Sequence, residues 1–137
     1  SACPLGEQAD AIVVDFHAEA TSEKQAIAHY LDGRVTLVVG THTHVPTSDY
    51  RVMAGGTAFQ SDVGMCGDYN SVIGMNHEEP LRRFLQKVPG ERFSPADGPA
   101  TLAGIAVEID EATGHATAVA PLRLGGVLSE TLPAFWS

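Results

Sequence analysis

Residues 11–44 read AIVVDFHAEATSEKQAIAHYLDGRVTLVVGTHTH. Two short apolar runs, residues 11–16 and 34–39, are rich in β-branched side chains, which favours two buried strands. Between them, Ser22 is a predicted helix cap and Gln25 stands at the capping-box position, so residues 22–31 predict a helix. Two strands joined by a helical crossover lie parallel and form a right-handed βαβ unit. The sequence therefore predicts an α/β fold that begins with this unit.

The predicted helix has one apolar side and a recognisable end. Gly33 suits the turn that follows the last helical residues. Four residues at helical spacing would pack on the sheet: Ala26, Ile27, Tyr30 and Leu31.

Three histidines directly follow the two predicted strands. His17 follows the first run, and His42 and His44 follow the second. Open α/β sheets bind ligands at the carboxyl ends of their strands, and residues i and i+2 of an extended segment project to one side. A single histidine is more often a hydrogen-bonded core or surface residue, but three at two strand ends favour a metal site. A third strand between the two would weaken this inference.

A two-metal centre also needs anionic oxygen ligands. Asp15 precedes His17 by two residues, and either binds the metal or orients an imidazole. Glu19, Glu23 and Asp62 are weaker candidates, because charges at a helix start and loop capping explain them equally well.

The other chemically interesting side chains lack a partner pattern. We interpret His29, His77 and His115 as surface residues. Cys66 has no recognisable base nearby and is interpreted as a small packed residue. Ser71 lacks the context of a nucleophilic serine.

Beyond Pro46 the pattern changes to hairpins and loops. We expect, in chain order, a hairpin of residues 50–53 and 57–60 joined through Gly55 and Gly56, an ordered loop over residues 61–76, a helix over 78–87 with Leu81, Phe84 and Leu85 inward, and a hairpin of residues 102–110 and 117–124. The glycine-rich part of the expected loop, residues 61–74, has three possible roles. It could line a substrate pocket, pack against another subunit or serve as a structural connection.

Composition narrows the class of protein. At 137 residues the chain is one domain in length, and its net charge of −9 argues against a nucleic-acid-binding surface. Cys3 and Cys66 match no disulfide framework or zinc motif, so we expect a cytoplasmic protein. No apolar stretch is long enough to span a membrane, and no signal peptide is recognisable. The first residue is not Met, and we expect the chain to be a piece of a longer protein.

Several segments together resemble a known family. These are residues 14–24, 31–35, 40–45, 62–65, 71–74 and 82–84. They resemble the YmdB-type branch of calcineurin-like metallophosphoesterases, over about residues 8–124. The resemblance implies a four-layer α/β sandwich flanked by helices, and hydrolysis of 2′,3′-cyclic nucleotides or similar phosphodiesters at a dinuclear metal centre. It implies that His17 and His42 bind one cation and His44 the other. Iron or manganese is expected, with magnesium or zinc as alternatives.

The resemblance also implies what this chain lacks. In the family, the aspartate, the bridging glutamate, the asparagine and the acid histidine precede the strand at residues 11–16. We therefore expect residues 1–124 to be the C-terminal half of such a domain, with residues 125–137 as a tail, and little turnover by the chain alone. The alternative is a non-catalytic metal- or nucleotide-binding module that acts through partner contacts. An amidohydrolase barrel needs a longer chain, and the predicted helix argues against a cupin. Assembly into a homo-oligomer stays open.

Overall fold

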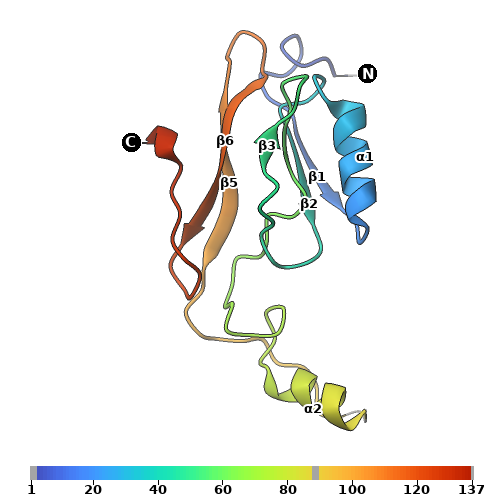
Figure 1. Ribbon diagram of the computed structural model, residues 1–137, viewed down its shortest axis with the longest axis vertical. Helices are drawn as coiled ribbons and strands as arrows, with labels where there is room; N and C mark the ends of the chain where they lie inside the picture. The colour runs from blue at the N-terminus through green and yellow to red at the C-terminus, as the bar shows by residue number, and fades with distance from the viewer. Residues whose placement is uncertain (1–2, 88–89, 137) are drawn as a thin grey trace.

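A four-stranded sheet carries the βαβ unit (Figure 1). The computed structural model describes residues 3–87 and 90–136. The strands β1 (Val13–His17), β2 (Leu37–Thr41), β4 (Ala58–Gln60) and β3 (Arg51–Val52) lie in the order β1-β2-β4-β3. β1 and β4 each pair in parallel with β2, and β3 pairs antiparallel with β4. The helix α1 (Thr21–Leu31) connects β1 to β2, so the prediction of neighbouring parallel strands is confirmed.

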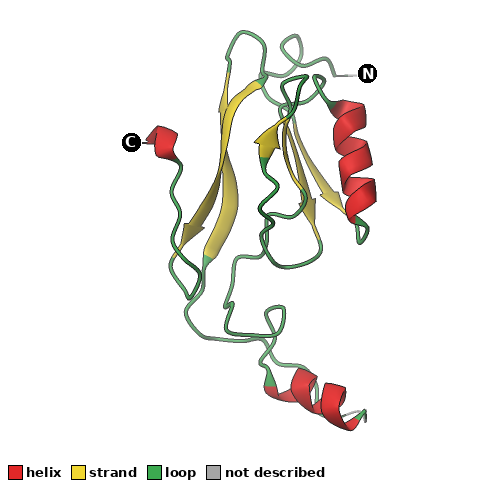
Figure 2. Ribbon diagram, in the orientation of Figure 1, coloured by secondary structure: helices red, strands yellow, loops and turns green. Residues whose placement is uncertain are grey.

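The sheet lies between a helix and a second sheet (Figure 2). α1 covers one face, where Val38 of β2 and Phe59 of β4 pack with Ala28 of α1. The other face packs against a hairpin of β5 (Leu102–Ile109) and β6 (Ala116–Leu124), and here Leu37 and Val39 contact Ala116. β2 is therefore buried on both faces, which explains its unbroken apolar sequence.

β1 differs from the buried strand that its composition predicts. It begins at Val13 rather than residue 11, and it is an edge strand. Val13 is 63% exposed, and burial alternates along the strand. An apolar run indicates a strand, but it does not indicate which strand ends the sheet. β2 also differs from its prediction, because it begins at Leu37 rather than at residue 34.

α1 has a different cap and a different buried face from those predicted. The helix begins at Thr21, with Ala20 at the cap position and no side-chain cap, so the prediction of capping by Ser22 is wrong. The residues it buries fully are Lys24 and Ala28, whereas Ala26 and Tyr30 of the predicted apolar face are exposed. The aromatic ring of Tyr30 instead lies 5.0 Å below the Arg34 guanidinium. Gly33 has φ +77° after the helix end, as its place in the sequence predicts.

The helix α2 (Glu78–Gln86) stands away from the two sheets (Figure 1). Leu81, Phe84 and Leu85 are 51%, 81% and 68% exposed, so the prediction that they point inward is wrong. The helical spacing of these residues is correct, but within the described residues no side chain of α2 is buried.

The predicted hairpins and the loop are confirmed with small shifts in their bounds. Residues 61–76 contain no helix or strand and are held by isolated bridges such as Gly67 to Thr101. Beyond β6 the chain turns back, Thr131 pairs with Arg123, and a short 3₁₀ helix covers Ala134–Trp136. In the part of the chain that the structure describes, no helix has the length and apolar character needed to cross a bilayer.

Candidate functional site

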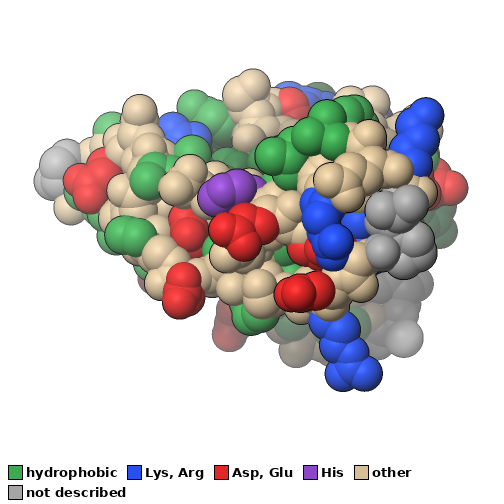
Figure 3. All heavy atoms as spheres, turned by 90° about the horizontal axis from the view of Figure 1, so that it is seen from below, with side chains coloured by type: hydrophobic (Ala, Val, Ile, Leu, Met, Phe, Trp, Pro, Cys, Tyr) green, Lys and Arg blue, Asp and Glu red, His purple; other side chains and the backbone are tan. Residues whose placement is uncertain are grey.

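Two of the three predicted site histidines meet at the carboxyl ends of β1 and β2. The register places His17 opposite Thr41, so His42 follows at the same end of the sheet. His17 Nε2 and His42 Nδ1 are 3.3 Å apart, and the two rings lie edge to face with centroids 5.2 Å apart. The lower face of the molecule as a whole carries both acidic and basic side chains (Figure 3). The parallel pairing of two neighbouring strands thus brings together residues 25 positions apart.

Asp15 orients His17 through a hydroxyl. The Thr41 Oγ1–H donates to Asp15 Oδ1 at 3.1 Å, and Thr41 Oγ1 is 3.1 Å from His17 Nδ1. Because the threonine proton is directed at the carboxylate, His17 Nδ1–H is the donor to Thr41. This arrangement leaves the lone pair of His17 on Nε2, the atom that faces His42. This contact through Thr41 fits the orienting role, the second of the two roles that the sequence allows for Asp15.

His44 is held by a different contact. Its Nδ1 lies 2.9 Å from the carbonyl oxygen of Ile73, so Nδ1–H donates and Nε2 keeps its lone pair. Ile73 belongs to the glycine-rich loop, and this contact connects that loop to the histidine segment. Among residues 3–87 and 90–136, no group of three His, Cys, Asp or Glu side chains is arranged to hold one metal ion.

The pair of His17 and His42 nevertheless fits part of a metal site. Metal–imidazole bonds of about 2.0–2.1 Å place two adjacent ligand nitrogens about 3.0–3.4 Å apart, depending on whether the geometry is octahedral or tetrahedral. The observed 3.3 Å lies within this range. Both nitrogens belong to groups that bind transition metals when neutral. The two residues can therefore fill two positions around one cation.

The backbone of the histidine segment is in an unusual conformation. His42 has φ 136° and His44 has φ 67°, a region that side chains other than glycine rarely adopt. Ile73, which accepts the hydrogen bond of His44, has φ 49°. Such backbone conformations persist only where surrounding contacts hold them, and they are concentrated at functional sites.

Asp62 lies beneath this segment and is not available as a ligand. Its Oδ2 accepts the Thr43 N–H at 2.7 Å and its Oδ1 accepts the Gly64 N–H at 2.9 Å. The Lys24 ammonium is 3.3 Å from Oδ2, and both side chains are nearly inaccessible. Burial opposes the charge of Asp62, but these donors outweigh it and lower the pKa of the carboxyl. Of the other weaker candidates, Glu19 and Glu23 are exposed.

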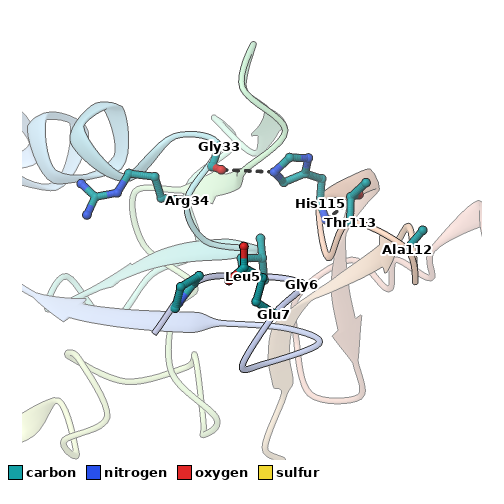
Figure 4. A pocket seen from close by; sticks show the side chains of 9 residues that line it. Leu5, Gly6, Glu7, Gly33, Arg34, Ala112, Thr113 and His115 are labelled. Atoms are coloured by element: carbon teal, nitrogen blue, oxygen red, sulfur yellow. Dashed lines mark hydrogen bonds between the residues drawn. The ribbon is translucent and has the colours of Figure 1, made fainter. Parts of the chain in front are cut away.

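His115 is half-buried, so its interpretation as a surface residue is wrong. Its Nε2 lies 3.2 Å from the Gly33 carbonyl oxygen (Figure 4). It lines a cavity of about 570 Å³ with Leu5 and Thr113, among others, at the end of the sheet where β2 begins. A hairpin histidine gives no sequence signal for this contact, because its partner is 82 residues away.

Cys66 and Ser71 contact backbone carbonyl oxygens, whereas two further histidines are exposed. His29 and His77 are exposed, as predicted. Cys66 is exposed rather than packed, and its thiol is 3.4 Å from the Ala103 carbonyl oxygen. The Ser71 hydroxyl donates to the Asp68 carbonyl and accepts the Gly74 N–H, which stabilises the loop.

Comparison with known proteins identifies the family. The model of the YmdB-like protein family matches residues 2–122. The chain belongs to the YmdB-like family. It is 49% identical to a 2′,3′-cyclic-nucleotide 2′-phosphodiesterase of Bacillus subtilis, over 79% of this chain and 40% of that protein. It is 46% identical to a putative phosphatase/phosphodiesterase of Mycoplasma pneumoniae, over 77% of this chain and 38% of that one.

Two solved structures of relatives share the fold of this YmdB-like chain. A hypothetical protein from Thermus thermophilus has a TM-score of 0.79 and 46% identity, covering 88% of this chain and 46% of its own. A phosphatase from Mycoplasma pneumoniae has a TM-score of 0.78 and 43% identity, covering 85% and 41%. The α/β fold that begins with a βαβ unit thus matches part of the metallophosphoesterase fold. The chain spans about 40% of the length of the curated relatives it matches.

Proposed function

We propose that the chain supplies the histidine part of a dinuclear metal centre in a metal-dependent phosphodiesterase. The observation that carries the proposal is the pair of imidazole nitrogens, His17 Nε2 and His42 Nδ1, that face each other at 3.3 Å where two parallel strands end. The names of the relatives, phosphodiesterase and putative phosphatase, agree with this chemistry.

Each histidine has a defined role in the proposal. His17 and His42 hold one cation, and His44 holds the second through Nε2, which its hydrogen bond to Ile73 leaves free. Iron or manganese suits imidazole together with carboxylate ligands, and magnesium or zinc is the alternative. When bound, the cations activate water and stabilise the charge that develops on a phosphodiester.

The proposed substrate is a 2′,3′-cyclic nucleotide or a similar small phosphodiester. The name of the Bacillus subtilis relative supports this choice. The chain carries a net charge of −9, which by itself repels an anionic substrate. Bound divalent cations reverse the local sign of the field, so the metal site is where an anion would bind.

The carboxylate ligands are proposed to come from outside this chain. Asp15 orients His17 and Asp62 is fully occupied by Lys24 and backbone N–H groups. The relatives are more than twice as long as the matched region, which leaves room for further ligands. We expect the chain alone to bind metal weakly and to turn over little substrate.

Isothermal titration calorimetry of the purified chain with Mn²⁺ tests the proposal. His17→Ala and His42→Ala should each weaken binding by about tenfold or more, since each removes a direct ligand. His29→Ala is the matched control, because His29 is an exposed histidine of α1. Equal Mn²⁺ binding by all four proteins, or none by the unmodified chain, would contradict the metal site.

A second measurement addresses the reaction. With Mn²⁺ present, the chain should bind 2′,3′-cyclic AMP and hydrolyse it far more slowly than the Bacillus subtilis relative does. Hydrolysis at the rate of that relative would show that the chain needs no further ligands. Binding of Mn²⁺ at sub-micromolar concentration without any turnover would favour the non-catalytic module.

A further inference from the structure

Lys24 of α1 and Asp62, which follows β4, form a buried ion pair directly behind the histidine segment. Lys24 is 1% exposed and Asp62 is 1% exposed, and Lys24 Nζ lies 3.3 Å from Asp62 Oδ2. Desolvating two charges costs about as much as their attraction returns, so a buried pair is weak evidence for added stability. Added stability therefore does not explain why this ion pair is buried here, and its other contacts indicate a different role.

Asp62 holds the peptide between the two site histidines. Its Oδ2 accepts the Thr43 N–H at 2.7 Å, and Thr43 stands between His42 and His44. The main chain of Asp62 is bound to the same segment, because the Thr47 N–H donates to its carbonyl oxygen at 2.9 Å. One residue thus fixes the chain on both sides of His44.

Gly40 allows this close approach. A Cβ atom at Gly40 would lie 1.8 Å from the Ser61 carbonyl oxygen and 2.7 Å from Lys24 Cδ. The Val63 N–H also donates to the Gly40 carbonyl at 3.0 Å. The absent side chain of Gly40 therefore lets the lysine stem and the chain beyond β4 reach the space under the histidine segment.

We propose that Lys24 and Asp62 are positioning residues of the histidine site. Asp62 fixes the Thr43 N–H, and with it the left-handed backbone of His42 and His44, while the Lys24 ammonium holds the buried carboxylate in place. The effect of the pair on metal binding rests on the proposed function. Its effect on the backbone does not, so the two can be tested apart.

Amide hydrogen exchange of the unmodified full chain tests the backbone contact first. Thr43 is exposed, yet its N–H should exchange slowly because the buried Asp62 carboxylate accepts it. Exchange at the rate of a free loop amide would overturn the proposal. This measurement needs no variant and no metal.

Substitutions test the consequence for the site. Asp62→Asn and Lys24→Met should each speed Thr43 exchange and weaken Mn²⁺ binding by about tenfold, the usual effect of removing a group that orients a ligand. Lys24→Met keeps the stem beside Gly40 and serves if Asp62→Asn does not fold. Arg83→Met, which breaks an ion pair with Glu79 on α2, is the control and should change neither quantity.

The outcomes separate the two proposals. If the unmodified chain binds no Mn²⁺ but Thr43 is protected and Asp62→Asn releases it, the proposed function fails and the positioning role stands. If a folded Asp62→Asn or Lys24→Met protein keeps both slow exchange at Thr43 and full Mn²⁺ affinity, the positioning role is overturned.

Discussion

At the scale of single residues, the histidine site depends on groups that carry no metal-binding signal of their own. Thr41 connects Asp15 to His17, and Asp62 holds the peptide between His42 and His44. The sequence identifies the histidines because imidazoles after two adjacent strands form a recognisable pattern. The sequence does not reveal the role of Thr41, because the high β-propensity of threonine is reason enough for it to stand at the end of a strand.

Removing the Thr41 hydroxyl tests its role. In Thr41→Val the side-chain shape is kept, but His17 Nδ1 loses its acceptor and Asp15 loses its donor. We expect Mn²⁺ affinity to fall by about tenfold and the ¹⁵N signals of His17 to show a mixture of tautomers. Thr117→Val, at an exposed position of β6, is the control. An unchanged His17 tautomer in Thr41→Val would contradict the orienting role.

At the scale of elements, the βαβ unit and both hairpins were predictable, whereas their exposed and buried sides were not. Its apolar ring and helical spacing predict that Tyr30 lies on the core face of α1, but Tyr30 is 66% exposed. Nothing in the helical pattern predicts that Lys24 is buried. It is buried against Asp62, which lies 38 residues further along the chain. Periodicity describes one element at a time, so it misses contacts that depend on a distant partner. The exposed apolar residues of α2 show the same limit.

The observed burial of α1 leads to a stability prediction. Ala28 is 0% exposed in the core between α1 and the sheet, so Ala28→Leu should overpack it and lower the free energy of unfolding by about 1–3 kcal/mol. Ala26→Leu, the matched change on the exposed side, should alter that free energy by less than about 0.5 kcal/mol. Urea unfolding followed by circular dichroism measures both. Equal losses in the two variants would mean that the helix faces are assigned wrongly.

At the scale of the whole molecule, the proposed metal site lies at the carboxyl edge of a single sheet. Two strands that follow one another in the chain bring His17 and His42 together, and a third element, the loop after β4, fixes His44 through Ile73. The rest of the centre is proposed to lie outside a chain that covers about 40% of its relatives. Sequence could place the histidines at this edge, but which of them meet depends on the backbone turns at His42 and His44.

The charge balance of the molecule gives a prediction about pH. The net charge of −9 suggests that mild acid, by reducing self-repulsion, should not destabilise the fold. Protonation of the Asp49 carboxyl, by contrast, lowers the stability of the fold. Burial raises the pKa of this carboxyl, but hydrogen bonds from Ser61 and Thr47 outweigh burial and hold it below its ordinary value. A carboxyl with a lowered folded-state pKa contributes stability above its unfolded pKa of about 3.9 and loses it as pH falls through the folded value.

We therefore expect the free energy of unfolding to stay nearly level from neutral pH to about pH 5 and to fall below about pH 4. Asp62, whose pKa is lowered in the same direction, adds to this fall. Asp49→Asn should lower stability at neutral pH and reduce the slope below pH 4, because the proton that Asp49 takes up on unfolding is gone. Asp97→Asn, at an exposed position, should leave the curve unchanged. Urea unfolding across this pH range measures the slopes, and an equally steep fall in Asp49→Asn would show that the carboxyl of Asp49 is not linked to folding.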